Sequence, residues 1–136
     1  MPQELAVGVI LINKDKFLLM RRFPSHWSFL KKNFEGEIDK VEVARQLCTE
    51  VLGSKSLFHV KGFAEKAEYF YTKKGSKIHK EIDFFIFETS ETKYADLSGE
   101  YMAATWLEYE RAITRTTFPV EKDILKLAQE HLKYNK

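Results

Sequence analysis

The sequence predicts a β-sheet that lies between helices, in a fold of the α+β or α/β class. Three observations support this prediction. Short β-branched runs near the N-terminus and two long aromatic runs between residues 58 and 89 are typical of strands. Residues 39–52 and 119–134 carry apolar side chains at helical spacing. The resulting order of strands, helix, strands and helix favours a sheet that is covered by helices.

The N-terminal part of the chain predicts a hairpin that is followed by a loop. Residues 5–13 form a short β-branched run that ends at turn-forming polar residues, and residues 17–20 are its expected partner. Residues 23–38 are expected to form a loop, because they contain Pro24, Gly36 and scattered polar side chains. The first helix is expected directly after this loop.

Residues 39–52 predict an amphipathic helix, with Asp39 as its N-cap and Gly53 as its stop. The apolar stripe of this helix consists of Val41, Ala44, Leu47, Cys48 and Val51. The opposite, polar face consists of Glu42, Arg45, Gln46, Thr49 and Glu50. We expect the apolar stripe to be buried against the sheet.

The second half of the chain predicts more strands and a last helix. Two long strand-like runs at residues 58–72 and 77–89 are joined by a turn, and residues 103–107 predict a further short strand. The last helix is expected from near Pro119 to about Tyr134. Its expected inward side chains are Val120, Ile124, Leu127, Ala128 and Leu132.

Length and composition are those of an ordinary globular domain. The chain has 136 residues, of which 44% are hydrophobic and 31% charged, so one domain over residues 1–136 is expected. The 22 basic and 20 acidic side chains leave a net charge of +2, which gives no reason to expect nucleic-acid binding. The single cysteine excludes an internal disulfide. The apolar N-terminal run is too short to span a bilayer and is unlike a signal peptide, so we expect no membrane partner and a cytoplasmic location.

Residues 27–53 carry the side chains that suggest chemistry. Glu35 and Glu37 lie on the expected loop, and the polar helix face follows directly. Carboxylates that are grouped at a loop–helix junction can hold a hard divalent cation, because Mg²⁺ takes oxygen ligands. The same residues also fit the ordinary solvated face of an amphipathic helix. The spacing alone leaves both interpretations open.

The order of these residues resembles the Nudix hydrolase family, whose box is G-x5-E-x7-R-E-U-x-E-E-x-G-U with U aliphatic. Residues 27–35 (WSFLKKNFE) resemble the lead-in W-x-F-P-K-G-H-V-E, which is typical of diadenosine-tetraphosphate hydrolases. Glu37 takes the first glutamate of the box, and Arg45, Leu47 and Glu50 match later positions. The resemblance implies an α+β Nudix fold, in which a mixed β-sheet lies between α-helices.

The resemblance extends beyond the box. The N-terminal hairpin, Tyr69 and residues 80–87 resemble the family's strands on either side of the helix. Residues 98–100 (SGE), followed by Trp106 and Leu107, resemble the S-x-E…W-L segment of the dinucleoside-polyphosphate branch. The match in order and spacing implies a nucleotide as the small-molecule partner.

The box departs from the family pattern at positions that matter for metal binding. Lys32 replaces the opening glycine, and one residue is missing between Lys32 and Glu37. Gln46 and Thr49 replace two of the three helix carboxylates, and Leu52 replaces the closing glycine. Metal affinity in oxygen sites depends on the number of charged ligands, so binding of Mg²⁺ or Mn²⁺ is expected to be weakened. Gln46 also cannot act as a general base, which typically contributes about 10²–10⁴-fold.

The resemblance implies three sets of site residues. The expected catalytic residues are Glu50, Arg45, Glu37 and Gln46. The expected metal ligands are Glu50, Glu100 and Thr49. The residues expected to contact substrate are Lys31, Lys32, Tyr69, Tyr71, Lys80 and His26. Arg45 is expected to orient Glu37 or Glu50, and for the two tyrosines base stacking and ordinary sheet packing are equal alternatives.

Two functions are consistent with these residues. The first is a pyrophosphohydrolase with weak or atypical activity on a nucleoside diphosphate linked to another moiety, most like diadenosine tetraphosphate. The alternative is a catalytically degenerate domain that senses a nucleotide or binds a protein, as the lost carboxylates suggest. Either protein is expected to act as a monomer or a homodimer.

Overall fold

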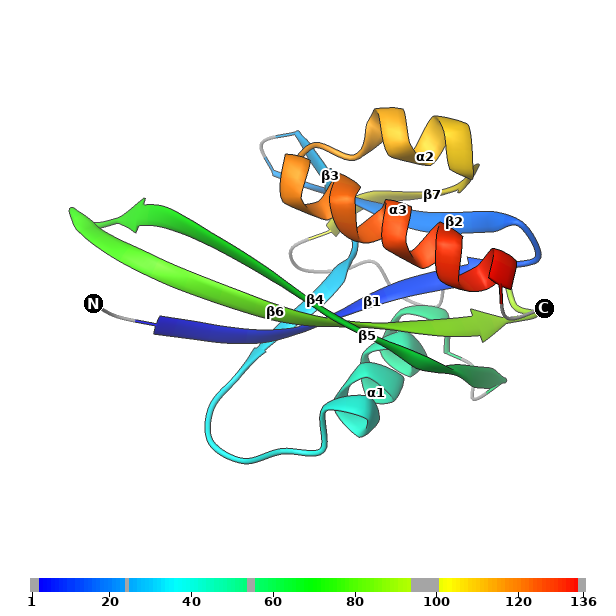
Figure 1. Cartoon of the computed structure of the whole chain (residues 1–136), viewed down its shortest axis with the longest axis horizontal. Helices are drawn as coiled ribbons and strands as arrows, with labels where there is room; N and C mark the ends of the chain where they lie inside the picture. Colours follow the sequence, from blue (N-terminus) through cyan, green and yellow to red (C-terminus); the bar gives the residue numbers. More distant parts are fainter. Residues whose placement is uncertain (1–2, 24, 54–55, 94–100, 135–136) are drawn as a thin grey trace.

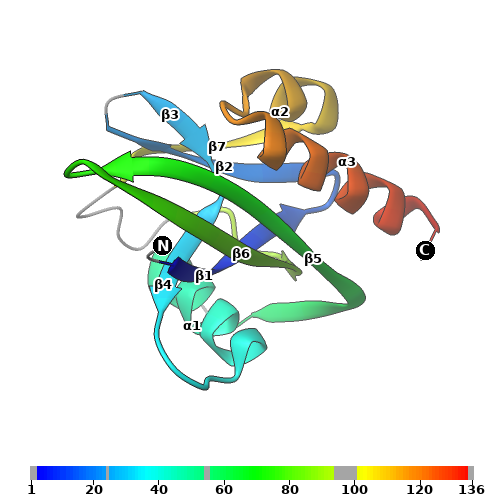
Figure 2. The same ribbon diagram turned by 60° about the vertical axis from the view of Figure 1, so that its left-hand side comes forward.

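The computed structural model describes residues 3–23, 25–53, 56–93 and 101–134. Within these residues the chain forms a mixed sheet with helices on both faces (Figure 1). Helix α1 (Lys40–Leu52) lies on one face, and α2 (Tyr109–Arg115) and α3 (Pro119–Tyr134) lie on the other, as the rotated view in Figure 2 also shows. No helix in these described ranges is long and apolar enough to cross a membrane. The layers confirm the expected α+β sandwich.

The described residues contain seven strands that belong to one sheet. They are β1 (Gln3–Asn13), β2 (Lys16–Arg22), β3 (His26–Ser28), β4 (Leu30–Phe34), β5 (Leu57–Lys73), β6 (Ser76–Thr89) and β7 (Tyr101–Glu108). The order through the sheet is β3-β2-β1-β6-β5, with β4 paired to β1 and β7 paired to β2. Because β1 is parallel to β6 and antiparallel to β2 and β4, it forms the centre of a mixed sheet.

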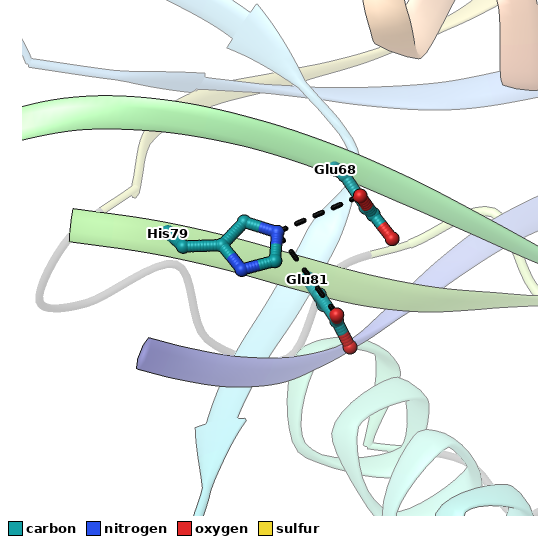
Figure 3. A group of neighbouring side chains, drawn as sticks. All are labelled: Glu68, His79 and Glu81. Atoms are coloured by element: carbon teal, nitrogen blue, oxygen red, sulfur yellow. Dashed lines mark ion pairs between the residues drawn. The ribbon is translucent and has the colours of Figure 1, made fainter. Parts of the chain in front are cut away.

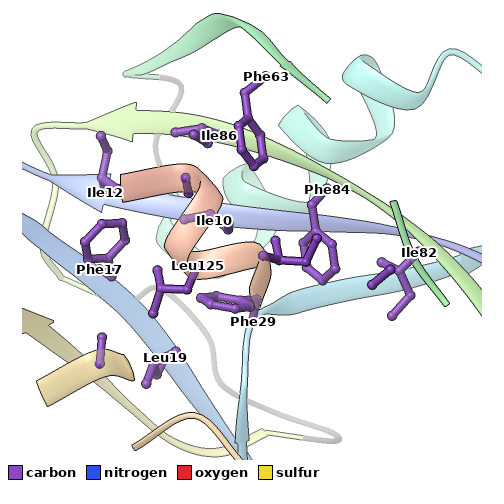
Figure 4. Packing of buried hydrophobic residues seen from close by; sticks show 14 of the residues in the cluster. Ile10, Ile12, Phe17, Leu19, Phe29, Phe63, Ile82, Phe84, Ile86 and Leu125 are labelled. Atoms are coloured by element: carbon purple, nitrogen blue, oxygen red, sulfur yellow. The ribbon is translucent and has the colours of Figure 1, made fainter. Parts of the chain in front are cut away.

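Alternate side chains of β1 supply two separate hydrophobic layers, as the pleat of a strand requires. The layer on the α3 side contains Ala6, Ile10 and Ile12 of β1 with Ile124, Leu125 and Ala128 of α3 (Figure 4). The layer on the α1 side contains Val7, Val9 and Leu11 of β1 with Ala44, Leu47, Cys48 and Val51 of α1. A residue's position along its strand therefore decides which helix its side chain meets.

Two local signals set the ends of α1, as predicted. The Asp39 side chain accepts a hydrogen bond from the backbone N–H of Glu42 at 3.1 Å, which satisfies a free donor of the first turn. Gly53 has a φ of 67°, a left-handed conformation that favours glycine, and donates its N–H to the carbonyl of Thr49. These caps fix the polar face of α1 relative to the sheet.

The expected loop over residues 23–38 contains the strands β3 and β4, so this prediction was wrong. Residues 26–28 pair with residues 20–22 of β2, and residues 30–34 pair with residues 5–9 of β1. Both strands are short, and β4 has the polar sequence LKKNF. Pairing with distant strands, which no local pattern reports, therefore overrides the weak strand propensity of these residues.

The C-terminal part differs from the prediction in two respects. The short helix α2 was not expected, and the inward stripe of α3 includes different residues. Leu127 is 40% exposed, whereas Leu125 is fully buried. The buried residues are Glu121, Ile124, Leu125 and Ala128, which follow helical spacing. A carboxylate therefore lies on the apolar face of α3.

Candidate functional site

The candidate site is divided between the two faces of the sheet, because consecutive residues of β4 point in opposite directions. The Lys31 side chain is buried and contacts Glu121 of α3. The Lys32 side chain lies on the other face and pairs with Glu50 of α1. The residues predicted from the sequence therefore form two groups, one beside α1 and one beside the start of α3.

The group beside α1 surrounds a cavity of about 440 Å³ on the polar face of that helix. The cavity is lined by Glu42, Arg45, Gln46, Thr49, Glu50 and Leu57. Spacings of three and four residues bring these side chains together, as expected for one helix face. Glu37 lines a different cavity, of about 480 Å³, with Phe34 and Lys40.

Arg45 makes a different ion pair from the one that the sequence predicted. Its Nε lies 3.8 Å from the Glu42 carboxylate, and its guanidinium lies over the ring of Phe87, 5.2 Å from the centroid. Residues three apart on a helix are surface neighbours, so Glu42 is the nearer partner. Within the described residues Arg45 does not pair with Glu37 or Glu50, and this part of the prediction was wrong.

The described residues on the polar face of α1 do not fit a tightly bound divalent cation. The Thr49 hydroxyl donates a hydrogen bond to a carbonyl of its own helix at 3.1 Å. Glu50 Oε1 lies 3.9 Å from the Lys32 ammonium, and Gln46 carries no charge. Carboxylates that are free to coordinate determine the affinity of such sites. Glu100 lies outside the described residues, and weakened binding of Mg²⁺ or Mn²⁺ stays a prediction.

The group beside α3 contains a buried ion pair. Lys31 Nζ lies 2.5 Å from Glu121 Oε2, and the two residues are 6% and 0% exposed. Burial lowers the pKa of Lys31, and the charge of Glu121 opposes this shift. Glu121 Oε1 is buried and has no hydrogen-bond partner among the described residues. A buried acceptor without a partner costs free energy, which a bound hydrogen-bond donor would recover.

Phe118, which directly precedes α3, lies beside this ion pair and joins three of the predicted substrate residues. Its ring is parallel to that of Tyr69, with an angle of 8° and a centroid distance of 6.4 Å. The His26 ring meets it edge to face at 5.0 Å, and Lys31 Nζ lies 5.6 Å from its centroid. Burial, together with the charge of Glu121, raises the pKa of Tyr69 to about 12, so its phenol stays neutral.

Tyr71 and Lys80 lie on the same face and share Glu4 as a partner. A hydrogen bond to Glu4 raises the pKa of Tyr71 to about 12, and Lys80 Nζ lies 3.7 Å from the Glu4 carboxylate. The rings of Tyr69 and Tyr71 are 6.3 Å apart, as expected for alternate residues of β5. The structure therefore brings together Lys31, Tyr69, Tyr71, Lys80 and His26 on one face, and places Lys32 on the other.

Phe118 and Glu121 were not among the residues predicted from the sequence. One signal for Glu121 was present, because it precedes Ile124, Leu125 and Ala128 at helical spacing and is therefore a carboxylate on an apolar stripe. No comparable signal marks Phe118, whose partners come from β3, β4 and β5. Its role depends on contacts between distant parts of the chain.

Comparisons with known proteins identify the fold. No family model and no curated protein matches the sequence. A Caenorhabditis elegans Ap4A hydrolase, solved as a binary complex, aligns with a TM-score of 0.78 at 22% identity, over 96% of this chain and 98% of that one. The Escherichia coli dihydroneopterin triphosphate pyrophosphohydrolase aligns with a TM-score of 0.71 at 12% identity, over 93% of this chain and 97% of that one. A Nudix hydrolase of M. smegmatis aligns with a TM-score of 0.68 at 12% identity, over 96% of this chain and 86% of that one. The chain therefore has the Nudix fold.

Proposed function

We propose that this chain binds a nucleoside polyphosphate beside α3, with the base against Tyr69 and Phe118. The observation that carries the proposal is a pair of parallel aromatic rings next to a buried carboxylate with an unpaired acceptor oxygen. The Nudix fold supports it, since the C. elegans protein with this fold is an Ap4A hydrolase. The altered polar face of α1 favours binding over hydrolysis.

The centroids of the two rings are almost as far apart as those of the outer rings in a stack of three rings. Carbon atoms pack best at about 3.5–4.0 Å, so a ring held between two others needs about 7 Å between the outer pair. The centroids of Tyr69 and Phe118 are 6.4 Å apart, and their planes are 8° from parallel. Phe118 is only partly buried, and a movement of its ring that sets the two rings face to face at about 7 Å would admit the base.

Glu121 supplies the directional contact in this arrangement. Its Oε2 is held by Lys31, so Oε1 is the atom left to accept a hydrogen bond from an amino or ring N–H group of the base. Arg22 and Lys80 lie close enough to lower the pKa of Lys31. The same two cations would attract the phosphates.

Removing either ring is expected to weaken nucleotide binding. Base–aromatic stacking contributes about 1–3 kcal/mol per base, so Tyr69→Leu and Phe118→Leu should each raise the Kd by about 5- to 150-fold. Isothermal titration with ATP and with diadenosine tetraphosphate measures this change. Phe70→Leu is the matched control, because Phe70 is an exposed aromatic residue on the opposite face of β5. Equal affinities for all three variants and the parent chain would contradict the proposal.

Slow hydrolysis of a nucleoside diphosphate linked to another moiety, most like diadenosine tetraphosphate, is a second candidate function. The cavity beside α1 favours it, because Glu50 and Arg45 both line that cavity. The Glu50→Gln variant distinguishes the two functions. Turnover that disappears in this variant would establish the hydrolase, and binding without turnover would support the nucleotide-binding protein.

Restoring the family residues is expected to create hydrolysis. The variant Lys32→Gly/Gln46→Glu/Thr49→Glu removes the ammonium beside Glu50 and adds two carboxylates to its helix face. General base catalysis typically contributes about 10²–10⁴-fold, so turnover of diadenosine tetraphosphate with Mg²⁺ should rise at least about 100-fold over the parent. Chromatographic product analysis measures it, with Glu50→Gln added to the same variant as the control. A restored variant as inactive as the parent would show that the lost carboxylates are not the cause.

A further inference from the structure

A second polar cluster lies on the α1 side of the sheet, on the long hairpin of β5 and β6 (Figure 3). It consists of Glu68, His79 and Glu81, of which Glu81 also lines the cavity that contains Glu37. Glu68 is paired directly with Glu81 across the two strands. His79 precedes Glu81 by two residues on β6, so both side chains project from the same face. Backbone pairing therefore holds the three residues together.

The donor atoms of this cluster converge at distances that suit a metal ion. His79 Nε2 lies 3.5 Å from Glu68 Oε2 and 4.0 Å from Glu81 Oε1, and one donor atom from each residue lies within 4.8 Å of the others. Zinc binds imidazole nitrogen and carboxylate oxygen at about 2.0–2.2 Å, which places tetrahedral ligands about 3.3–3.5 Å apart. Side-chain movements of less than about 1 Å would therefore close the cluster around one ion.

The charges of the cluster favour a cation at its centre. Like charges directly opposite each other on paired strands are destabilising, and Glu68 and Glu81 occupy such a pair. His79 Nε2 is buried and has no hydrogen-bond partner among the described residues. Its Nε2 points at the carboxylate oxygens of Glu68 and Glu81, so a cation held between these three groups would have one nitrogen and two oxygen ligands.

The surroundings orient the cluster for coordination. Lys66 Nζ lies 3.3 Å from Glu81 Oε2, which leaves Oε1 directed toward His79. The Phe70 ring stacks on the His79 ring at 4.8 Å with an angle of 20°, and this contact restricts rotation of the imidazole. Hydrogen-bonded carboxylates and restrained histidines around a metal are typical of functional metal sites.

We propose that Glu68, His79 and Glu81 bind one divalent transition-metal ion of the zinc type, with a fourth position open to water. The imidazole ligand favours zinc and its neighbours in the first transition row over Mg²⁺, which prefers an all-oxygen shell. The ion would join β5 to β6 on the face that carries Glu68. This site is independent of nucleotide binding beside α3.

Titration of the metal-free chain with Zn²⁺ by calorimetry tests the proposal. One ion per chain is expected, and Glu68→Gln and His79→Gln should each weaken its binding at least about tenfold. Glu65→Gln is the matched control, because Glu65 lies on the same strand but three residues away, on the opposite face. Glu50→Gln should bind this ion as the parent does, which separates the site from the polar face of α1.

Co²⁺ absorption spectra give a second measure of the same site. A band characteristic of mixed nitrogen and oxygen coordination should appear in the parent and be absent from His79→Gln. Circular dichroism checks that Glu68→Gln, a change at an exposed side chain, leaves the fold intact. Zn²⁺ affinity that is unchanged in both Glu68→Gln and His79→Gln, or absent from the parent, would overturn the proposal.

Discussion

Replacing Glu121 with alanine is expected to lower the free energy of unfolding by about 3–5 kcal/mol. Lys31 would then lose the partner that lies 2.5 Å away, while it stays buried, with only 6% exposure. Removing one member of a buried pair leaves an uncompensated charge, and this effect dominates the cost. Urea unfolding, followed by the fluorescence of Trp27 and Trp106, measures the change.

The loss should also depend on pH. Burial already lowers the pKa of Lys31, and without Glu121 the two contributions that raise this pKa disappear. A lysine with a lowered folded-state pKa binds fewer protons folded than unfolded, so the stability of the variant rises with pH. The penalty is therefore full at pH values below the folded-state pKa of Lys31, and it decreases as the pH rises from there to 10.5, the usual lysine value.

The double variant Lys31→Met/Glu121→Leu separates charge from packing. Replacing a buried ion pair by apolar residues of similar volume is often neutral or stabilising by about 1–4 kcal/mol. We therefore expect the double variant to be at least as stable as the parent, yet to bind nucleotide more weakly, because the Oε1 acceptor is gone. A double variant as unstable as Glu121→Ala would mean that the loss comes from packing. If the double variant is as stable as the parent and binds nucleotide equally well, Glu121 does not make the proposed contact with the nucleotide.

The parts of the fold that local sequence encodes were predicted, and the parts that depend on distant pairing were not. The caps Asp39 and Gly53 act within a few residues, so both ends of α1 were evident. The strand β4 exists because residues 30–34 pair with β1, more than 20 positions earlier in the chain. The sequence LKKNF has no strand pattern that could report this pairing.

The same distinction applies to the candidate site. The polar face of α1 was predicted, because helical spacing alone places Gln46, Thr49 and Glu50 together. The contact between Lys31 and Glu121 joins positions 90 apart, and it exists only once β4 and α3 have packed. The resemblance to the Nudix box also placed Lys32 at the position of its opening glycine. Only the structure adds that its ammonium lies 3.9 Å from Glu50 Oε1, so the two side chains form an exposed ion pair.

Gly8→Ala is expected to destabilise the chain by about 1–3 kcal/mol, although it adds a single methyl group. Gly8 lies opposite Phe84 in the parallel pairing of β1 with β6. A Cβ at Gly8 would lie 2.5 Å from Phe84 Cδ1 and 3.0 Å from Ile82 Cγ2, and both residues are fully buried. The Phe84 ring has little room to move, since it packs edge to face on Phe29 at a centroid distance of 5.9 Å (Figure 4).

A smaller partner should relieve this overlap. Phe84→Leu alone costs stability because it opens space in the core, but in the double variant Gly8→Ala/Phe84→Leu the new methyl group fills part of that space. In urea unfolding, the double variant should therefore lose less stability than the sum of the two single losses, by at least about 0.5 kcal/mol. Additive losses would show that the Phe84 ring does not cause the strain.

Phe29 is separated from Lys31 by one residue, so a displaced Phe84 ring would also shift the strand that carries Lys31. Gly8 also pairs directly with Lys31 across β1 and β4, so Gly8→Ala should weaken nucleotide binding, and the double variant should recover part of it.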